Sequence, residues 1–381
     1  MGTEDTVPIV CGGSVGALSL ALMLSTTHDV TLIHHDEYCY ESNKGDTRGL
    51  RIVNLSEDMI DVLIDGLKFY VDVGIQNLFM TSHILHAFPK ACVDFQAHHF
   101  YFANEKQKDL LKVLLTRLGH GDYTQPYEIM GTSKDGTYVY VKENTGGVYD
   151  YKGLCAQLMD RVKMNKNILY VNEKIIKLEK VANNEEVTRV VTDKYTRDAS
   201  HVYLALGNGI LDVDMKEYKC KSPVPIFNEF SYYTLSRNLD FNSLWAWQEN
   251  GTQLGYYVMM EKSNVLKVAS DTSFVKYNQI SKDNLIGYRN VKDNFVYNLL
   301  NIDPNDVLSI SFSPCYYSVC DFIQQKSNVS ILHAAGYGYL VPGWCKRMIQ
   351  GCLTDTVCKC QLYENVYEKD HHEYPHFNCK L

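Results

Sequence analysis

The segment Val7-Pro-Ile-Val-Cys-Gly-Gly-Ser-Val-Gly-Ala-Leu-Ser-Leu-Ala-Leu-Met-Leu24 joins a short apolar run to a glycine turn and then to a run of small and apolar residues. We expect a strand over residues 7–10, a tight turn at 11–13 and a helix after the turn. A second strand, Val30-Thr-Leu-Ile33, follows within a few residues. Strand, glycine turn, helix and strand form the first βαβ unit of a dinucleotide-binding fold, in which the N-terminus of the helix faces a pyrophosphate.

The glycine turn departs from the usual G-x-G-x-x-G pattern at its first position. Glycines in this pattern let backbone N–H groups approach phosphates without a clash from Cβ, and the residue that ends the second strand, usually an acid, binds the ribose hydroxyls. One such pattern is weak evidence, so a glycine turn that only packs a helix against a sheet is the alternative. The candidate cofactor-binding residues of this segment are Cys11, Gly12, Gly13, Ser14 and Gly16, with His34 in place of the acid.

Length and composition indicate a globular chain that is comfortable for two domains, with 381 residues and 45% hydrophobic content. The net charge of −8 argues against a nucleic-acid partner, because no excess of Lys and Arg is present to displace phosphate counterions. The first apolar run is short and follows Glu4 and Asp5, which argues against a secretory signal and a membrane anchor. The 12 cysteines show neither metal-type nor disulfide-like spacing, so we predict no metal site and expect reduced thiols inside a cell.

The last three residues, Cys379-Lys380-Leu381, are a conservative variant of the S-K-L peroxisomal address. The stretch before them, residues 364–378, is polar and rich in histidine, so the tripeptide is expected to be accessible. We therefore expect a peroxisomal import receptor as a partner and the peroxisome as the location, with the cytoplasm as the alternative.

The rest of the chain alternates between helical and strand-like stretches. A polar loop is expected over residues 41–51, and a mostly antiparallel, strand-rich region over 222–310 that offers aromatic side chains. A buried strand near residues 201–206, ending in a glycine turn, is expected to extend the first sheet. Helices are expected over residues 56–73, 107–118, 150–164, 284–300 and 343–363, further strands over 168–171 and 329–333, and a hairpin over 174–192.

Three later segments resemble the monomeric sarcosine oxidase family of flavin amine oxidases, which includes N-methyl-amino-acid and L-pipecolate oxidases. Gly45-Asp-Thr-Arg-Gly-Leu-Arg51 is similar to the family's G-D-T-R-x-x-R loop, and Val265-Leu-Lys-Val268 to its G-L-K-L strand. Cys315-Tyr-Tyr-Ser318 is similar to C-x-Y-T, and Ser327-Asn-Val-Ser-Ile-Leu-His-Ala-Ala-Gly-Tyr337 to S-N-V-x-I-A-A-G-F. The matches lie in order along nearly the whole chain.

The resemblance implies a role for each matched residue. Arg51 would bind the substrate carboxylate, with Arg48 as its companion near the flavin; a planar bidentate donor suits that task. Lys267 would activate dioxygen, since a fixed cation stabilises superoxide and peroxide. Cys315 would form a thioether to the FAD, because a thiolate is a strong nucleophile. Gly336 and Gly338 belong to the turn that the family places at the cofactor.

The same turn has lost the family's second basic residue, because Leu340 stands where a lysine is expected; Lys346 is the nearest replacement in sequence. The resemblance implies an oxidase of a secondary-amine or N-methyl amino acid that transfers a hydride to FAD, forms an imine and reduces O2 to H2O2 as a monomer. Two alternatives remain open: an FAD-binding oxidoreductase of another substrate class (a D-amino-acid oxidase or a dehydrogenase), and a catalytically silent protein that keeps the fold for structural or partner-binding work.

The predicted fold class is α/β plus α+β. A discontinuous Rossmann-like FAD-binding domain is expected over residues 1–82, 148–222 and 310–375. A mostly antiparallel-sheet substrate domain is expected over residues 83–147 and 223–309, and residues 376–381 would form a tail with the peroxisomal signal.

Overall fold

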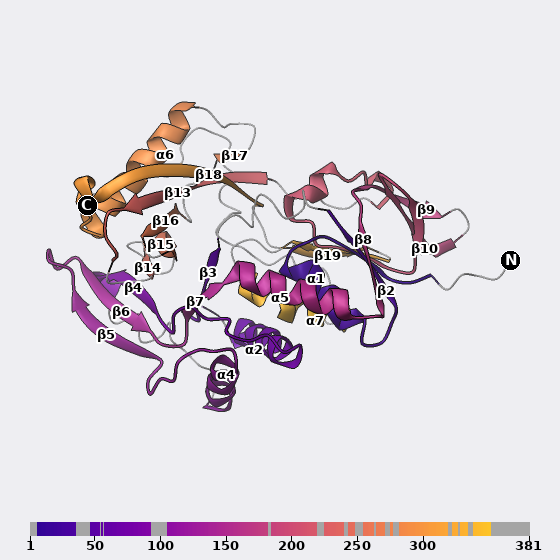
Figure 1. The fold of residues 1–381 in the computed structure, drawn as a ribbon, viewed down its shortest axis with the longest axis horizontal. Coiled ribbons are helices and arrows are strands. Elements are labelled where there is room, and N and C mark those ends of the chain that lie inside the picture. The colour runs from indigo at the N-terminus through magenta and orange to yellow at the C-terminus, as the bar shows by residue number, and fades with distance from the viewer. Residues whose placement is uncertain are drawn as a thin grey trace.

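The fold is taken from a computed structural model of the chain. It describes residues 6–35, 46–53, 55, 57–92, 105–181, 184–218, 225–239, 243–247, 254–262, 264–270, 275–276, 282–318, 322–326, 328–333 and 338–351. Figure 1 shows a mostly antiparallel sheet on one side of the molecule and a parallel sheet with its helices on the other. None of the described helices is long and apolar enough to cross a membrane.

The first βαβ unit forms as the sequence predicts. Strand β1 (Ile9–Cys11) is followed by helix α1 (Val15–Leu24) and by strand β2 (Val30–His34), which pairs with β1 in parallel. Both strands are buried along their length, which explains why they read as continuous apolar runs rather than as alternating ones.

The parallel sheet has the strand order β19-β20-β12-β1-β2-β8. Strand β12 pairs with β1 in parallel, as expected for the buried stretch near residue 201, and β20 and β8 extend the sheet in parallel on either side. The carboxyl ends of these strands therefore meet at one edge, where open α/β sheets bind ligands. The remaining bounds are β8 (Ile168–Asn172), β12 (Val202–Leu204), β19 (Phe322–Lys326), which is antiparallel to β20, and β20 (Val329–His333).

Helices cover one face of this sheet and a small sheet covers the other. On the helical face, one hydrophobic cluster joins α1 to the other helices, which lie together in Figure 1. A second cluster packs Ile9, Cys11 and Ile33 against Leu178 and Val190 of the small antiparallel sheet. The helices are α2 (Glu57–Asp72), α4 (Glu105–Arg117), α5 (Tyr151–Met164) and α7 (Val341–Ile349), and the small sheet is β9 (Ile175–Val181), β10 (Asn184–Thr192) and β11 (Thr196–Ala199).

The second large sheet is mostly antiparallel, as predicted, with the order β17-β13-β16-β15-β14-β4-β6-β5 and with β18 beside β13. Its one described parallel pair joins β14 to β4. Helix α6 (Lys282–Asn294) and the π-helical turn Phe295–Leu299 cover one face through Phe295 and Val296. The strands are β4 (Ile84–Pro89), β5 (Tyr127–Thr132), β6 (Tyr138–Glu143), β13 (Pro225–Leu235), β14 (Ser243–Trp247), β15 (Leu254–Lys262), β16 (Val265–Ser270), β17 (Val275–Lys276) and β18 (Val307–Ser318).

The structure differs from the sequence interpretation in three details. The helix predicted over residues 343–363 ends at Ile349, and residues 352–363 lie outside the described part of the chain. Residues 47–50 form a strand, β3 (Thr47–Leu50), paired with β7 (Gly147–Asp150), where the polar composition had predicted a loop. Strand β18 pairs with β13 along its length, so residues 310–318 of the expected FAD-binding domain lie in the antiparallel sheet. Short 3-10 helices complete the described chain at Lys90–Cys92, Gly207–Asp212, Lys216–Tyr218, Pro304–Asp306 and Gly338–Leu340.

Candidate functional site

One face of the antiparallel sheet gathers aromatic side chains and two of the predicted cations. The strand register places Trp245 opposite Tyr257, and Met259 opposite Lys267. Since side chains alternate along a strand, Tyr257 and Met259 share one face, and their partners lie on it too. This aromatic face is buried: Trp245 stacks on Tyr257 with ring centroids 4.9 Å apart, and Trp247 stacks on Phe88 at 5.2 Å.

Lys267 is a buried cation on the aromatic face. Only 1% of its side chain is exposed, and its Nζ lies 3.2 Å from Glu261 Oε1 and 4.6 Å from the centroid of the Phe230 ring. A lysine on a strand usually lies at an exposed edge, but β16 lies between β13 and β15 in the interior of the sheet. A buried ammonium group is costly unless it is paired, and Glu261 supplies the opposite charge.

Arg51 follows β3 and extends over the same aromatic face. Its guanidinium carbon lies 5.1 Å from the ring centroid of Trp245 and 5.4 Å from that of Trp247. The residue is 8% exposed. A guanidinium over indole faces is held by cation–π attraction while its N–H groups remain directed outward in the plane. The aromatic face therefore carries both Arg51 and Lys267.

Arg48 does not join them. Residues 49 and 51 lie on one side of the β3 segment and Arg48 on the other, because side chains alternate. A Cβ at Gly49 would overlap the ring of Trp245, whereas the Arg48 guanidinium lies 4.6 Å from the ring centroid of Tyr151, at the start of α5. The two arginines that the motif sets three residues apart thus contact different parts of the protein.

A buried polar network supports Arg51 and was not singled out from the sequence. Trp247 Nε1 donates to His86 Nδ1 at 3.0 Å, and His86 Nε2 lies 2.7 Å from Glu143 Oε2. The other Glu143 oxygen accepts from the Ile52 N–H at 2.5 Å. Burial, with the nearby Arg51 charge, lowers the pKa of His86, although the contact with Glu143 opposes the shift. The neutral ring therefore accepts at Nδ1 and donates at Nε2, which fixes the Trp247 indole beneath Arg51.

The predicted phosphate turn lies at the carboxyl edge of the parallel sheet. Gly12 has φ +142°, and a Cβ there would overlap the carbonyl oxygen of Ala205, while a Cβ at Gly16 would lie 3.2 Å from Leu332 and Val341. Packing therefore accounts for both glycines. The N-cap residue Ser14 makes no side-chain hydrogen bond to α1, and a helix end of this kind suits a phosphate.

The side chain of Cys11 faces away from the turn. It packs in the hydrophobic cluster with Ile33 and Leu204, and burial raises the pKa of its thiol. Any contact that Cys11 makes with a nucleotide therefore falls to its backbone. Gly13 is buried within the turn, beside Gly12.

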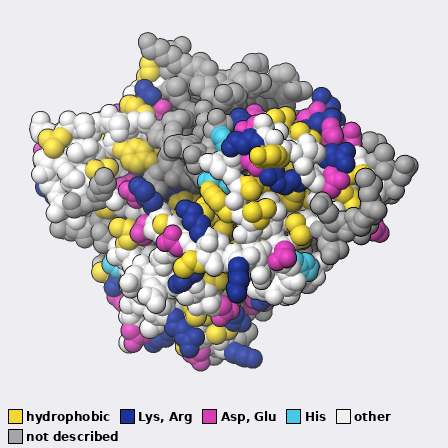
Figure 2. Space-filling model, turned by 45° about the vertical axis from the view of Figure 1, so that its right-hand side comes forward, with side chains coloured by type: hydrophobic (Ala, Val, Ile, Leu, Met, Phe, Trp, Pro, Cys, Tyr) yellow, Lys and Arg dark blue, Asp and Glu magenta, His cyan; other side chains and the backbone are white. Residues whose placement is uncertain are grey.

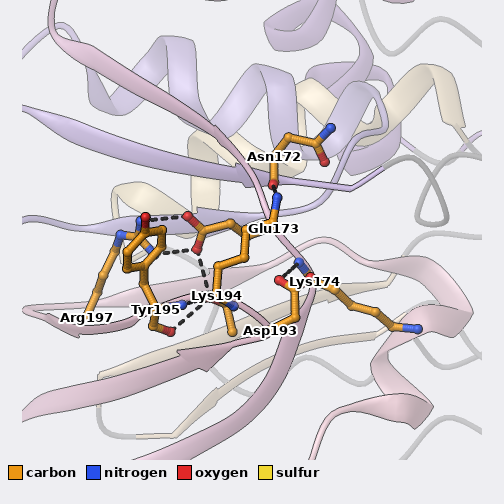
Figure 3. Close-up of polar contacts among 8 residues, drawn as sticks. Asn172, Glu173, Lys174, Asp193, Lys194, Tyr195 and Arg197 are labelled. Atoms are coloured by element: carbon orange, nitrogen blue, oxygen red, sulfur yellow. Dashed lines mark hydrogen bonds and ion pairs between the residues drawn. The ribbon is translucent and has the colours of Figure 1, made fainter.

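His34 ends β2 at the same edge, as predicted, and is buried beside Tyr170 with ring centroids 5.6 Å apart. A carboxylate, Glu173, follows β8 next to it, and its N–H donates to the His34 carbonyl at 2.9 Å. Figure 3 shows the Glu173 carboxylate facing Arg197, which donates to both oxygens at 2.5 and 2.7 Å. Thr192 Oγ1 donates to it at 2.7 Å. Glu173 thus fastens the small sheet to the parallel one and does not present a free carboxylate.

The remaining predicted residues belong to the last third of the chain. Cys315 belongs to β18, opposite Asn228 of β13. Gly338 opens the short helix Gly338–Leu340, where a Cβ would meet no atom of the described residues within 4 Å. Gly336 lies outside the described residues. Leu340 is a fully buried core residue, and Lys346 pairs with Asp65 of α2 at 2.7 Å. Lys346 therefore joins two helices and does not replace the missing basic residue.

Charges of both signs are intermingled over the described part of the face shown in Figure 2. Within the described residues, no group of His, Cys, Asp and Glu has the arrangement of a metal site.

Comparisons with known proteins identify the fold. No protein-family model matches the chain, and no curated protein matches its sequence. Among solved structures, NikD, an unusual amino acid oxidase essential for nikkomycin biosynthesis, is similar with a TM-score of 0.62 at 15% identity, over 97% of this chain and 100% of that one. L-proline dehydrogenase from P. horikoshii is similar with a TM-score of 0.63 at 13% identity, over 92% of this chain and 95% of that one. L-alpha-glycerophosphate oxidase from Mycoplasma pneumoniae, with FAD bound, gives 0.61 at 13% identity, over 91% and 94%. The chain therefore has the fold of these enzymes along almost its whole length.

Proposed function

We propose that this protein is an FAD-dependent oxidase of an amino acid that carries a secondary or N-methylated amine. The observation that carries the proposal is the aromatic face, on which a buried lysine and a buried arginine lie together. A substrate carboxylate requires a positive charge to bind in a site without water, and dioxygen requires one because its reduction produces an anion.

The residues that would hold FAD fit its chemistry. The turn at 11–14 and the uncapped start of α1 would bind the pyrophosphate, and His34 occupies the strand end where a ribose is usually bound. Cys315 would attach the flavin if the link is covalent. Bound FAD would supply the hydride acceptor and the electrons that reduce dioxygen.

The chain's own residues would bind, orient and shield the reactants. Arg51 would hold the substrate carboxylate through two parallel N–H groups, and Trp245 and Trp247 would fix the plane of that fork. Lys267 would stabilise negative charge on dioxygen. The surrounding aromatic rings exclude water, which strengthens both interactions.

A dehydrogenase of the same substrate class is the second candidate, and the Lys267–Glu261 pair favours it. A carboxylate 3.2 Å from Nζ screens the positive charge, so less of the field would reach dioxygen. The similarity to L-proline dehydrogenase also supports this candidate. A silent protein that keeps the fold remains the third, and it would fail to bind FAD.

The absorbance spectrum of the purified protein, before and after acid precipitation, tests the proposal. Covalent FAD is indicated if the flavin stays in the acid precipitate of the wild type and is released into the supernatant from a Cys315→Ala variant. Release of the flavin from the wild type indicates non-covalent FAD. Anaerobic mixing with sarcosine or L-pipecolate, followed by oxygen, then separates an oxidase from a dehydrogenase through the peroxide released. A colourless protein that cannot be reconstituted with FAD would refute both enzyme candidates.

We also propose a peroxisomal location from Cys379-Lys380-Leu381. A fluorescent protein fused ahead of the chain should collect in peroxisomes and should become diffuse when these three residues are deleted. Identical distributions of the two fusions would refute the assignment.

A further inference from the structure

Glu261 contacts Lys267 through one carboxylate oxygen. The Nζ–Oε1 distance is 3.2 Å, and the side chains of Lys267 and Glu261 are 1% and 6% exposed. The contact is an ion pair without the alignment of a directed hydrogen bond. Lys267 is thus confined between this carboxylate and the ring of Phe230.

The other oxygen of Glu261 binds the start of β3. It accepts from the N–H of Asp46 at 2.6 Å and from the N–H of Thr47 at 3.0 Å. These two residues open the segment that continues to Arg51. One carboxylate therefore connects the cation proposed for dioxygen with the strand that carries the cation proposed for the substrate.

Glu261 also lies at the wall of a cavity of about 450 Å³. Asp46, Asp150 and Lys152 line it, together with Gly153 and Ala156 of α5. Because the Lys152 side chain is 79% exposed, the cavity reaches from the surface to Glu261. Glu261 thus lines this cavity and also contacts Lys267.

Fixing a lysine side chain is otherwise difficult, because four rotatable bonds allow many positions and freezing them costs entropy. A carboxylate already held by two backbone N–H groups has little freedom of its own. An ion pair with such an anchor defines the position of the ammonium group more strictly than a pair between two mobile side chains.

We propose that Glu261 is a positioning residue that sets the place of the Lys267 ammonium group and couples it to β3. This inference rests on the proposed function, because Lys267 acts on dioxygen only in the flavin-loaded protein. Glu261 itself touches neither reactant in this assignment.

The variant Glu261→Gln isolates the charge, since the amide oxygen of glutamine can still accept from the Asp46 and Thr47 N–H groups. Loss of the ion pair removes a screening charge, which would speed reoxidation by O2, and also frees the Lys267 side chain from its fixed position, which would slow it. We expect the loss of position to outweigh the gain in charge, so that reoxidation in the FAD-loaded protein slows about tenfold, a typical loss for a contact pair, while anaerobic reduction by substrate changes less than about twofold. In a Lys267→Met background the same change should leave reoxidation unaltered, because Glu261 acts through Lys267.

A matched control is Glu128→Gln, which alters another Glu–Lys contact of this sheet, at 3.8 Å and more exposed. It should leave both rate constants unchanged. Urea unfolding of the FAD-free protein gives a readout without activity: Glu261→Gln and Lys267→Met should each lower the midpoint, and the double variant should lower it by less than their sum.

The outcomes separate this inference from the proposed function. If Lys267→Met slows reoxidation and Glu261→Gln does not, the positioning role is wrong and the oxidase assignment stands. If Glu261→Gln slows reoxidation equally in the Lys267→Met background, Glu261 does not act through Lys267. If the protein binds no FAD, the proposed function and this inference fall together, whereas additive urea midpoints would refute the pairing alone.

Discussion

Arg51 offers the most direct test of the substrate site, through the variant Arg51→Ala. The guanidinium lies over two indole rings, at 5.1 and 5.4 Å, and the residue is 8% exposed. A carboxylate held there would lose two charge-assisted hydrogen bonds, each worth about 1.5–3 kcal/mol. A total of about 3 kcal/mol or more corresponds to a loss of roughly a hundredfold or more in kcat/KM.

The assay compares substrates with and without the carboxylate. Sarcosine and L-pipecolate would be measured against dimethylamine and piperidine, which keep the amine. Arg51→Ala should remove the preference for the carboxylates by lowering their kcat/KM, and should leave the simple amines nearly unchanged. Arg51→Lys should recover only part of the preference, since it keeps the charge and loses the planar fork.

Arg48→Ala provides the matched control, because Arg48 contacts Tyr151 on the other side of β3. It should change the ratio between a carboxylate substrate and its amine less than about threefold, whatever it does to flavin binding. An unchanged ratio in Arg51→Ala would remove Arg51 from the substrate site. An equal loss of the carboxylate preference in both variants would contradict the different roles that the structure suggests for Arg48 and Arg51.

Three predictions concern the free energy of unfolding, and urea unfolding measures each of them. Burial lowers the pKa of His201 from 6.5 to about 4; the unfolded chain therefore takes up its proton first, and about 3 kcal/mol of stability is lost as pH falls from 6.5 to 4. His201→Gln should lose less over this range, and equal losses would contradict the assignment. Burial lowers the pKa of Lys292 from 10.5 to about 8, so wild-type stability should rise by about 3 kcal/mol between pH 8 and 10.5, and Lys292→Met should lack that rise. Gly343→Ala would place a Cβ on the carbonyl of Val62 in α2 and should cost at least about 2 kcal/mol. Gly287→Ala, whose Cβ would meet no atom of the described residues within 4 Å, should not destabilise the protein.

The sequence predicts the parallel half of the fold well because its signals are local. A glycine turn between an apolar strand and a helix specifies β1, α1 and β2 within about 25 residues, and the apolar periodicity of α2 and α5 is complete within each helix. The loop predicted over residues 41–51 was wrong at 47–50. A polar stretch is typical of a loop, and the partner strand β7 lies a hundred residues further along the sequence. A local pattern therefore could not show this pairing.

The sequence suggests candidate residues for the site but not their contacts. Resemblance selected Arg48, Arg51 and Lys267 by type and spacing, and such spacing does not show that β3 directs two neighbouring arginines to opposite sides. The support of Arg51 by His86 and Glu143 joins strands β4 and β6, 57 residues apart. Glu261, by contrast, could have been found from the sequence, because the consecutive strands β15 and β16 pair and bring it near Lys267.

The cost of these buried charges bears on whether the protein is an enzyme or a silent scaffold. Lys267, Glu261, Arg51 and Glu143 all lie on or beside one buried face. Replacing a buried ion pair with well-packed apolar residues is often neutral or stabilising by about 1–4 kcal/mol. A fold kept only for its shape has no need of two buried cations at the aromatic face. Dioxygen reduction and carboxylate binding each require one of them, so this arrangement favours an enzyme.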